Sequence, residues 1–367
     1  MSITAALLLV SPLLQTGTLE APASPRRPFA EQVRALLEKQ QADQSLVGLA
    51  AAVVVDDVII EYYLGHEDLE EEVRVSKDTL FRWASISKPV TSIAAMQLVE
   101  KGQLDLDADV RKHVTEFPEK PWPVTSRQLM QHRGGIVHYT NGKVIRTQRE
   151  YESEHPFADT VFALDKFRES PLIAEPDTLY AYSTHGYMLL GAVVQRAGKA
   201  PFHAQVQERI AGPLGMTTFR PDYQWEPMEH RAVGYFRLRE KVLRTGNTDV
   251  SWKLPGGGFL STIGDLARFA RGIAKEELVS ETSWKAMWTP QIAPETESGK
   301  FNYGLGFGIN QEGSELRVSH SGSQQKTRTL MQIKPGSNRA VVLMSNSTWA
   351  SLAPIANGIW EILDAQD

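Results

Sequence analysis

The chain has 367 residues, enough for one large domain or two smaller ones, and its 42% hydrophobic and 23% charged residues are typical of a globular protein. The net charge of −5, with no basic tail, argues against a nucleic-acid-binding protein. Because the sequence has no cysteine, it excludes a cysteine nucleophile, a thiolate metal site and a disulfide framework.

Residues 1–25 form the one candidate targeting segment. An apolar run at 3–14 is too short to span a membrane comfortably, and Ala21-Pro22-Ala23 resembles a small-residue cleavage site. No Lys or Arg precedes the apolar run, unlike in a typical signal peptide. Two interpretations stay open: a signal peptide, which predicts export to the periplasm or the cell exterior, or a disordered N-terminus on a protein that stays in the cytoplasm. A membrane contact is expected only through this segment.

Residues 26–367 are expected to form a single domain that begins with a helix and a hairpin. At 29–41 the apolar residues recur with helical spacing. At 46–65 two β-rich runs flank Asp56-Asp57, which predicts a hairpin of two buried strands. From about residue 85 to about residue 271 the pattern is mostly helical, and loops containing Pro and Gly interrupt it.

The strand pattern returns near the C-terminus. Four short β-like runs follow one another, at 303–309, 316–321, 327–334 and 339–345. The sequence Pro335-Gly336-Ser337-Asn338 predicts a turn between the last two runs. A final helix is expected at 352–363.

Strands at both ends of the domain, with helices between them, predict one sheet that is completed by distant parts of the chain. The sheet region would comprise about 28–84 and 255–367, and the helical region about 85–254. The fold class is therefore α+β, or a mixed α/β sandwich, in which helices flank the sheet and a mostly helical region is inserted. A cleft between the two regions is the natural place for a functional site.

The stretch Ser85-Ile86-Ser87-Lys88 opens a run that is apolar on most sides, which predicts a buried helix with Pro89 in its first turn. Residues three apart share a helix face, so Lys88 can lie beside the Ser85 hydroxyl. A serine hydroxyl is a weak nucleophile until a base takes its proton. Burial lowers the pKa of a lysine, and this makes a neutral amine available as that base.

A capped helix start that faces solvent is the alternative interpretation of these four residues. Ser-x-x-Lys is a short pattern that occurs about once by chance in an average chain of this kind. It recurs at Ser323-Gln324-Gln325-Lys326, which follows a glycine and precedes a strand-like run. The Ser and Lys of this second copy should not share a helical face. The local sequence therefore leaves Ser85 undecided between catalysis and capping.

Two distant stretches favour catalysis, because three motifs occur in the order of a known family: Ser85-Ile86-Ser87-Lys88, Tyr182-Ser183-Thr184 and His320-Ser321-Gly322. They resemble the S-x-x-K, Y-x-N and K-T-G or H-x-G motifs of the serine beta-lactamase and penicillin-binding superfamily. The resemblance covers about residues 45–365. It is closest to the class C-like branch, peptidase family S12, which includes DD-peptidases, certain esterases and a beta-lactamase-like protein of mitochondria. It implies the beta-lactamase/DD-peptidase fold, with an antiparallel sheet.

The resemblance implies catalytic roles for four residues. Ser85 would be the acylating nucleophile. Lys88 and Tyr182 would share the general-base and general-acid work, with the tyrosine pKa lowered by the neighbouring ammonium. The backbone N–H groups of Ser85 and Ser323 would form the oxyanion hole.

The resemblance also implies a substrate-binding strand edge. His320 and Ser321 would line it, Gly322 would let the substrate backbone approach closely, and Thr184 would contact substrate. Thr184 stands where the family usually has Asn, and His320 stands where beta-lactamases usually have Lys. A histidine with an ordinary pKa near 6.5 is mostly neutral at pH 7, so it attracts the carboxylate of a penicillin less than an ammonium does. Both departures favour a peptidase or an esterase over an efficient beta-lactamase.

We therefore expect a serine hydrolase that cleaves an amide or ester in a small peptide or ester substrate, peptidoglycan-derived peptides included, without a cofactor or metal. The sequence has neither the H-E-x-x-H motif of a zinc site nor the G-x-S-x-G of an α/β-hydrolase. His132, His138 and His185 are expected to be structural. Three alternatives stay open: a beta-lactamase, a penicillin-binding module that acylates without efficient turnover, and a pseudoenzyme.

Overall fold

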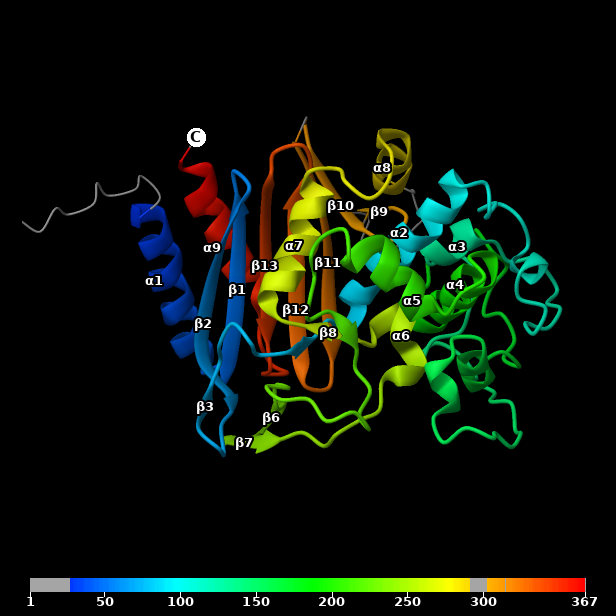
Figure 1. Ribbon diagram of the computed structural model, residues 1–367, viewed down its shortest axis with the longest axis horizontal. Helices are drawn as coiled ribbons and strands as arrows, with labels where there is room; N and C mark the ends of the chain where they lie inside the picture. Colours follow the sequence, from blue (N-terminus) through cyan, green and yellow to red (C-terminus); the bar gives the residue numbers. More distant parts are fainter. Residues whose placement is uncertain (1–26, 291–301, 314, 367) are drawn as a thin grey trace, which may run out of the picture.

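The computed structural model describes residues 27–290, 302–313 and 315–366 (Figure 1). The segment 1–25, interpreted above as a signal peptide or a disordered N-terminus, lies outside the described residues. Within the described ranges, no helix combines the length and apolar character that a membrane crossing requires.

The main sheet joins the two ends of the chain. In the described residues it has eight strands in the order β3-β2-β1-β13-β12-β11-β10-β9, and neighbouring strands are antiparallel. The N-terminal strands are β1 (Gly48–Val55), β2 (Val58–Asp68) and β3 (Val73–Arg74). The C-terminal strands are β9 (Asn302–Tyr303), β10 (Gly308–Glu312), β11 (Glu315–Gln324), β12 (Thr327–Lys334) and β13 (Arg339–Ser345). The pairing of β1 with β13 confirms that distant parts of the chain complete one sheet.

The sheet is covered on both faces (Figure 1). Helices α1 (Arg27–Gln44) and α9 (Leu352–Asp364) pack on one face, and α7 (Ile263–Ala274) packs on the other. Successive strand residues point to opposite faces, so β1 contributes to two cores. Ala50, Ala52 and Val54 belong to the core on the α7 side, and Leu49, Ala51 and Val53 to the core beneath α1 and α9. A strand buried on both faces explains the continuous apolar run of β1.

The predicted first hairpin is confirmed, and its turn explains the two aspartates. Asp56 and Asp57 join β1 to β2 with φ angles of 47° and 66°. Two consecutive residues with positive φ are typical of the type I′ turn, which matches the right-handed twist of the flanking strands. Asp is one of the few residues other than glycine that tolerates this conformation.

The inserted region contains the buried helix predicted after Ser85, here α2 (Ser87–Glu100), whose residues 87–98 are all buried. The other helices of this region are α3 (Ser126–Met130), α4 (Thr184–Ala197), α5 (Phe202–Val206) and, at its end, α6 (Leu254–Gly257), whereas α8 (Glu281–Trp288) follows α7. Less of the region is helical than the sequence indicates. Residues 131–183 form no helix longer than a short 3₁₀ turn, because the segment 139–156 is mostly polar and has no apolar stripe to bury.

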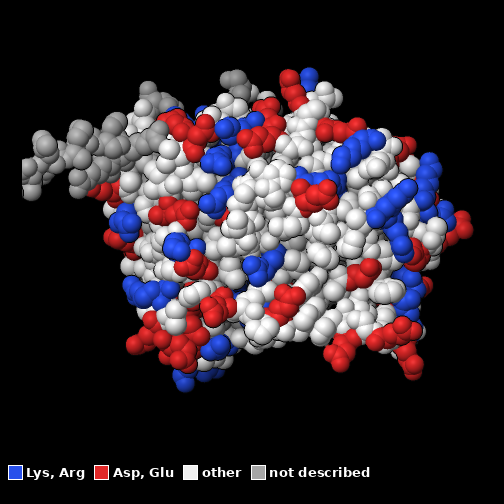
Figure 2. All heavy atoms as spheres, in the orientation of Figure 1, with Lys and Arg blue, Asp and Glu red and all other residues white. Residues whose placement is uncertain are grey.

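Short strands also interrupt this region. One small sheet contains β4 (Phe81–Arg82), β8 (Phe259–Ser261) and β5 (Arg220–Pro221), and a hairpin contains β6 (Tyr235–Leu238) and β7 (Lys241–Arg244). Figure 2 shows Lys and Arg interspersed with Asp and Glu over one face of the molecule, so neither sign of charge dominates that face.

Three helices of the inserted region, α2, α4 and α6, contact one another. The contact between α4 and α6 depends on Gly191, because a Cβ at this position would lie 2.1 Å from Pro255 Cγ. Proline has little freedom to move away, so only glycine permits this close approach. The same contact positions the carbonyl of Gly256, which is part of the site described below.

We expect Gly191→Ala to lower the free energy of unfolding by about 1–3 kcal/mol, because the added methyl group overpacks the contact with Pro255. Urea denaturation followed by circular dichroism measures the change. Gly246→Ala is the matched control, since a Cβ at Gly246 meets no atom within 4 Å. Equal stability of the two variants would contradict the packing role of Gly191.

Candidate active site

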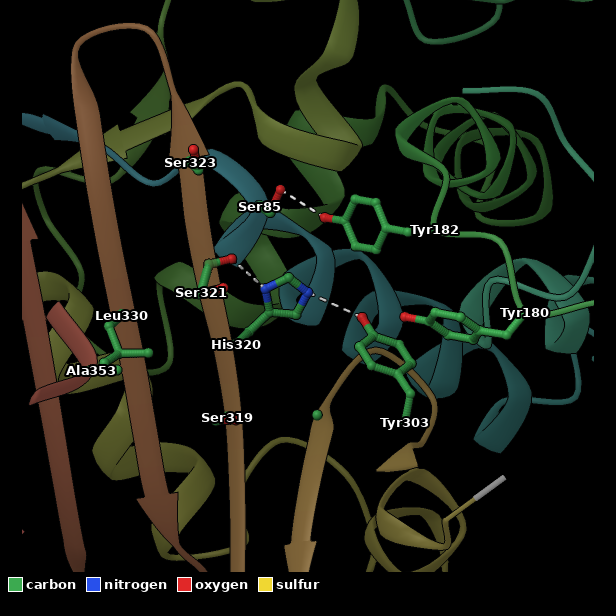
Figure 3. Close-up of a pocket in the computed structure, with 11 residues that line it drawn as sticks. Ser85, Tyr180, Tyr182, Tyr303, Ser319, His320, Ser321, Ser323, Leu330 and Ala353 are labelled. Atoms are coloured by element: carbon green, nitrogen blue, oxygen red, sulfur yellow. Dashed lines mark hydrogen bonds between the residues drawn. The ribbon is translucent and has the colours of Figure 1, made fainter. Parts of the chain in front are cut away.

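Ser85 lies in a single 3₁₀ turn, Ala84–Ile86, directly before α2. Ala84 is buried and has a φ of 48°, in the left-handed region that residues other than glycine seldom adopt. Ser85 itself is partly exposed and lines a cavity of about 550 Å³ (Figure 3). The prediction that Ser85 stands at the start of a buried helix is confirmed, and its hydroxyl bonds the side chains of Lys88 and Tyr182 rather than capping α2.

Lys88 lies beneath Ser85 and is fully buried. Its Nζ is 3.1 Å from Ser85 Oγ, 3.3 Å from Thr184 Oγ1 and 2.7 Å from the carbonyl oxygen of Gly256. No carboxylate of the described residues lies within 4.0 Å of this amine. Burial holds the pKa of Lys88 well below its usual range, and the positive charge of Lys253 lowers it further. The surroundings therefore favour the neutral amine.

Tyr182 completes the cluster, because its hydroxyl donates a hydrogen bond of 2.8 Å to Ser85 Oγ (Figure 3). Its ring centroid is 4.8 Å from Lys88 Nζ. The expectation that an ammonium lowers the pKa of Tyr182 is wrong, since burial raises it instead. The hydrogen bond to Ser85 acts in the opposite direction but does not cancel the effect of burial. Tyr182 is therefore a proton donor in the resting site.

Two histidines hold the loop that carries Tyr182. His132 Nδ1 accepts a hydrogen bond of 3.1 Å from the N–H of Ser183, and His138 Nδ1 accepts one of 3.2 Å from the N–H of Thr184. Burial lowers the pKa of His138 to about 4 and that of His132 well below its usual range, so both rings stay neutral and able to accept. These contacts agree with the structural role expected for both residues. The ring of His185 likewise contacts a backbone carbonyl, that of Val137, at 3.0 Å.

The third motif lies on β11, beyond the point where β10 stops pairing with it at Ser319. His320 Nδ1 donates to the carbonyl of Ser321 at 2.7 Å, and the hydroxyl of Tyr303 lies 3.1 Å from Nε2. Since Nδ1 carries the proton, Nε2 accepts from Tyr303. Burial lowers the pKa of His320 to about 3, so the ring is neutral. His320, Ser321 and Ser323 all line the cavity of Ser85, as expected for a binding edge.

Two residues predicted to contact substrate, Gly322 and Thr184, do not line the cavity in the structure. Gly322 is buried, and a Cβ there would lie 2.5 Å from the carbonyl oxygen of Trp83 and 2.1 Å from Thr329 Oγ1. Glycine is therefore needed for β11 to pack against the turn of Ser85, rather than for the approach of substrate. Thr184 is also buried, and its Oγ1 lies 3.3 Å from Lys88 Nζ.

Some residues of the site were not predicted from the sequence. Tyr180 and Tyr303 line the cavity, and the carbonyl of Gly256 binds Lys88. Tyr180 precedes Tyr182 by two positions, and this spacing puts both side chains on one side of an extended segment. Tyr303 and Gly256 are far from the three motifs in the sequence, and only the folded chain brings them there.

The comparisons with known proteins agree with the resemblance seen in the sequence. The family model described as Beta-lactamase matches residues 33–357. The human mitochondrial serine beta-lactamase-like protein LACTB is 28% identical over 381 aligned residues, which cover 79% of this chain and 69% of the relative. Penicillin-binding protein 4* of Bacillus subtilis (strain 168) is 24% identical, with 82% and 68% covered.

Solved structures show the same fold. The D-amino acid amidase from Ochrobactrum anthropi SV3 superposes with a TM-score of 0.75 at 22% identity, over 92% of this chain and 99% of that one. EstCE1, described as a hydrolase with promiscuous acyltransferase activity, superposes with a TM-score of 0.76 at 18% identity, over 90% and 98%. The fold prediction of an antiparallel sheet with flanking helices and a helical insert is confirmed. Because the family match extends over most of its length, the chain belongs to the beta-lactamase family of serine hydrolases.

Proposed function

We propose that this protein hydrolyses an amide or ester through an acyl intermediate on Ser85. One observation supports the proposal above all others: Ser85 Oγ lies 2.8 Å from the hydroxyl of Tyr182 and 3.1 Å from Nζ of Lys88, beside a cavity of about 550 Å³. A serine nucleophile requires a base with a free electron pair. A buried lysine without a counter-charge supplies one near neutral pH.

In the acylation step, Ser85 Oγ attacks the carbonyl carbon of the substrate while Lys88 Nζ takes the hydroxyl proton. The backbone N–H groups of Ser85 and Ser323 stabilise the oxyanion of the tetrahedral intermediate. Tyr182 then donates its proton to the leaving nitrogen or oxygen, and the ammonium of Lys88 returns a proton to Tyr182. The bond to the leaving group breaks, and the acyl group stays on Ser85.

Deacylation repeats these steps with water as the nucleophile. Tyr182 and Lys88 take a proton from the water, whose oxygen attacks the acyl carbon. Ser85 Oγ leaves and recovers a proton, and a carboxylic acid is released. The same pair of residues therefore serves as base and acid in both halves of the reaction.

The site favours a peptidase or an esterase over a beta-lactamase. Beta-lactams carry a carboxylate, and the ring of His320 is neutral with both of its nitrogens already in hydrogen bonds. It offers this carboxylate no positive charge. By their names, two proteins of the same fold are a D-amino acid amidase and a hydrolase with acyltransferase activity, which supports amides and esters as substrates.

We expect a fluorophosphonate probe to label the wild-type protein at Ser85 and not to label Ser85→Ala. Intact-protein mass spectrometry detects the adduct. Ser87→Ala is the matched control, because Ser87 lies two residues further on, is buried in α2 and bonds the carbonyl of Ala84. Unchanged labelling of Ser85→Ala would refute the assignment. A stable stoichiometric adduct with beta-lactams, without turnover of any amide or ester, would instead indicate a penicillin-binding module.

We expect Lys88→Ala and Tyr182→Phe each to lower kcat by at least about 100-fold, the usual scale of acid–base catalysis. Steady-state hydrolysis of p-nitrophenyl esters and D-amino acid amides measures the loss. Tyr63→Phe controls for the removal of a tyrosine hydroxyl elsewhere, since Tyr63 on β2 bonds Glu61 and should retain full activity. Near-normal turnover of either site variant would rule out the proposed role of that residue.

We expect His320→Gln to make folding less sensitive to acid. The folded-state pKa of His320 is about 3 and its ordinary value is 6.5, so the unfolded chain binds more protons between these values. The wild-type protein then loses up to about 1.4 kcal/mol of stability per pH unit through this residue as the pH falls from 6.5 towards 3. Urea denaturation at several pH values measures the slope. A slope equal to that of the wild type would show that His320 is not held neutral.

A further inference from the structure

Two further cavities continue from the Ser85 cavity along the hairpin of β11 and β12. A cavity of about 460 Å³ shares Ser323 with the Ser85 cavity. It also shares Thr245 and Gly246 with a third cavity of about 490 Å³. The shared residues place the three cavities next to one another, and this row of adjoining cavities is called the groove below.

The third cavity is lined by three cations, Arg231, Arg244 and Lys326, and by no acidic side chain among the described residues. Carboxylates lie within 4.0 Å of Arg231 and of Arg244, but among the described residues none lies within that distance of Lys326. Arg231 lies 3.3 Å from the buried Asp222, but Asp222 also bonds the buried Arg82 at 2.5 Å.

Arg244 has two acidic neighbours, and neither is within hydrogen-bonding distance. Its guanidinium is 3.6 Å from Asp68 and 3.9 Å from Glu70, both longer than a hydrogen bond. The Arg244 side chain is 53% exposed, so it can turn towards a ligand in the cavity.

Lys326 is the least balanced of the three cations. The residue is 8% exposed, and its Nζ bonds the amide oxygen of Asn247. No carboxylate of the described residues lies within 4.0 Å of this ammonium. Burial lowers the pKa of Lys326 to about 8, and the nearby positive charge of Arg82 contributes to the shift. The more distant carboxylate of Asp222 offsets only part of this shift, so an anion in direct contact with the ammonium would stabilise it further.

The backbone at Lys326 is a second, independent observation. Lys326 has a φ of 74° in the two-residue turn between β11 and β12, where glycine or asparagine is usual. Gly234 packs so closely that a Cβ there would lie 2.2 Å from Lys326 Cα. A lysine that is unfavourable both in conformation and in charge is better explained by a ligand than by folding.

The cavity between the two sites is also electropositive. Arg328 lines it together with Ser323, and its guanidinium donates to the carbonyl of Thr327 at 3.1 Å. No carboxylate of the described residues is within 4.0 Å of Arg328. An anionic substrate group would therefore meet positive charge in both cavities beyond Ser323.

We propose that the natural substrate of Ser85 carries a carboxylate remote from the bond that is cleaved, and that Lys326, with Arg231 and Arg244, binds this carboxylate in the third cavity. The inference rests on the proposed hydrolase function. Lys326 lies in the turn that follows the end of β11 at Gln324, so the anion would bind beyond the end of the strand that carries Ser323. The substrate is then an extended molecule, uncharged at the cleaved bond and acidic at one end.

The test compares esters that differ only in a remote charge. One series consists of p-nitrophenyl monoesters of linear dicarboxylic acids of graded length, each paired with its methyl-capped neutral analogue. A second series places the free carboxylate on the leaving group instead. We expect one of the two series to contain a chain length that fits the groove. At that length the ester with the free carboxylate should have a KM about tenfold lower than its methyl-capped analogue, the scale of one charge-assisted contact.

We expect Lys326→Met to remove this preference and to leave kcat for the neutral esters unchanged. Lys326→Arg should keep most of the preference for the acid over its neutral analogue, because the positive charge remains. The matched control is Lys241→Met, which removes an exposed cation from β7 outside the cavity and should behave as the wild type. If Lys326→Met does not fold, Lys326→Asn suits the left-handed turn and serves in its place.

Two outcomes would overturn the inference: equal KM values for acids and neutral analogues in both series, or a preference that survives in Lys326→Met. Hydrolysis of the neutral esters, abolished in Ser85→Ala, tests the proposed function separately. Loss of the charge preference with retained neutral hydrolysis would therefore refute only the anion site.

Discussion

The buried amine of Lys88 is the constraint on which the site depends. Its 2.7 Å contact with the carbonyl of Gly256 and its contacts with Ser85 and Thr184 require α2, α6 and α4 to meet at one point. Glycines make this meeting possible: a Cβ at Gly256 would lie 2.7 Å from Thr184 Cγ2, and one at Gly191 would clash with α6. Buried polar groups are tolerated only when they have partners. The helices of the inserted region therefore pack closely around a group that a purely structural core would avoid.

This burial makes the site nearly free of charge at neutral pH. The pKa values of Lys88, His320 and His138 are all lowered, and that of Tyr182 is raised, in each case mainly by desolvation. A site without formal charge is suited to a substrate that is neutral at the cleaved carbonyl. When such a substrate binds, no charged group of the site has to lose its hydration. Positive charge is found further along the groove instead. In the function and the anion site proposed above, chemistry and recognition of charge are separated in space, and Lys326 is not among the groups that shift the pKa of Lys88.

The sequence predicted what depends on local pattern and chain order. Periodicity located β12, β13 and α9, and the motif order identified Ser85, Lys88 and Tyr182, which the fold brings within hydrogen-bonding distance. It did not predict which face a side chain occupies. Thr184 and Gly322 were expected at the substrate, but packing against Lys88 and Trp83 places them behind the cavity wall. The pKa of Tyr182 was predicted in the wrong direction, because that direction depends mainly on how deeply the phenol is buried, which only the fold determines.

The two Ser-x-x-Lys copies show why a motif needs its backbone. At Ser85 the chain is helical, residues three apart share a face, and Nζ of Lys88 lies 3.1 Å from Oγ. At Ser323 the chain is a strand that ends in a two-residue turn, and Lys326 points into a different cavity. Both lysines lack a carboxylate partner among the described residues, but full burial favours the neutral amine in Lys88, whereas Lys326 keeps a pKa of about 8 and is mostly protonated at pH 7. The same four-residue pattern therefore favours a neutral amine at one site and a cation at the other, and the depth of burial decides between them.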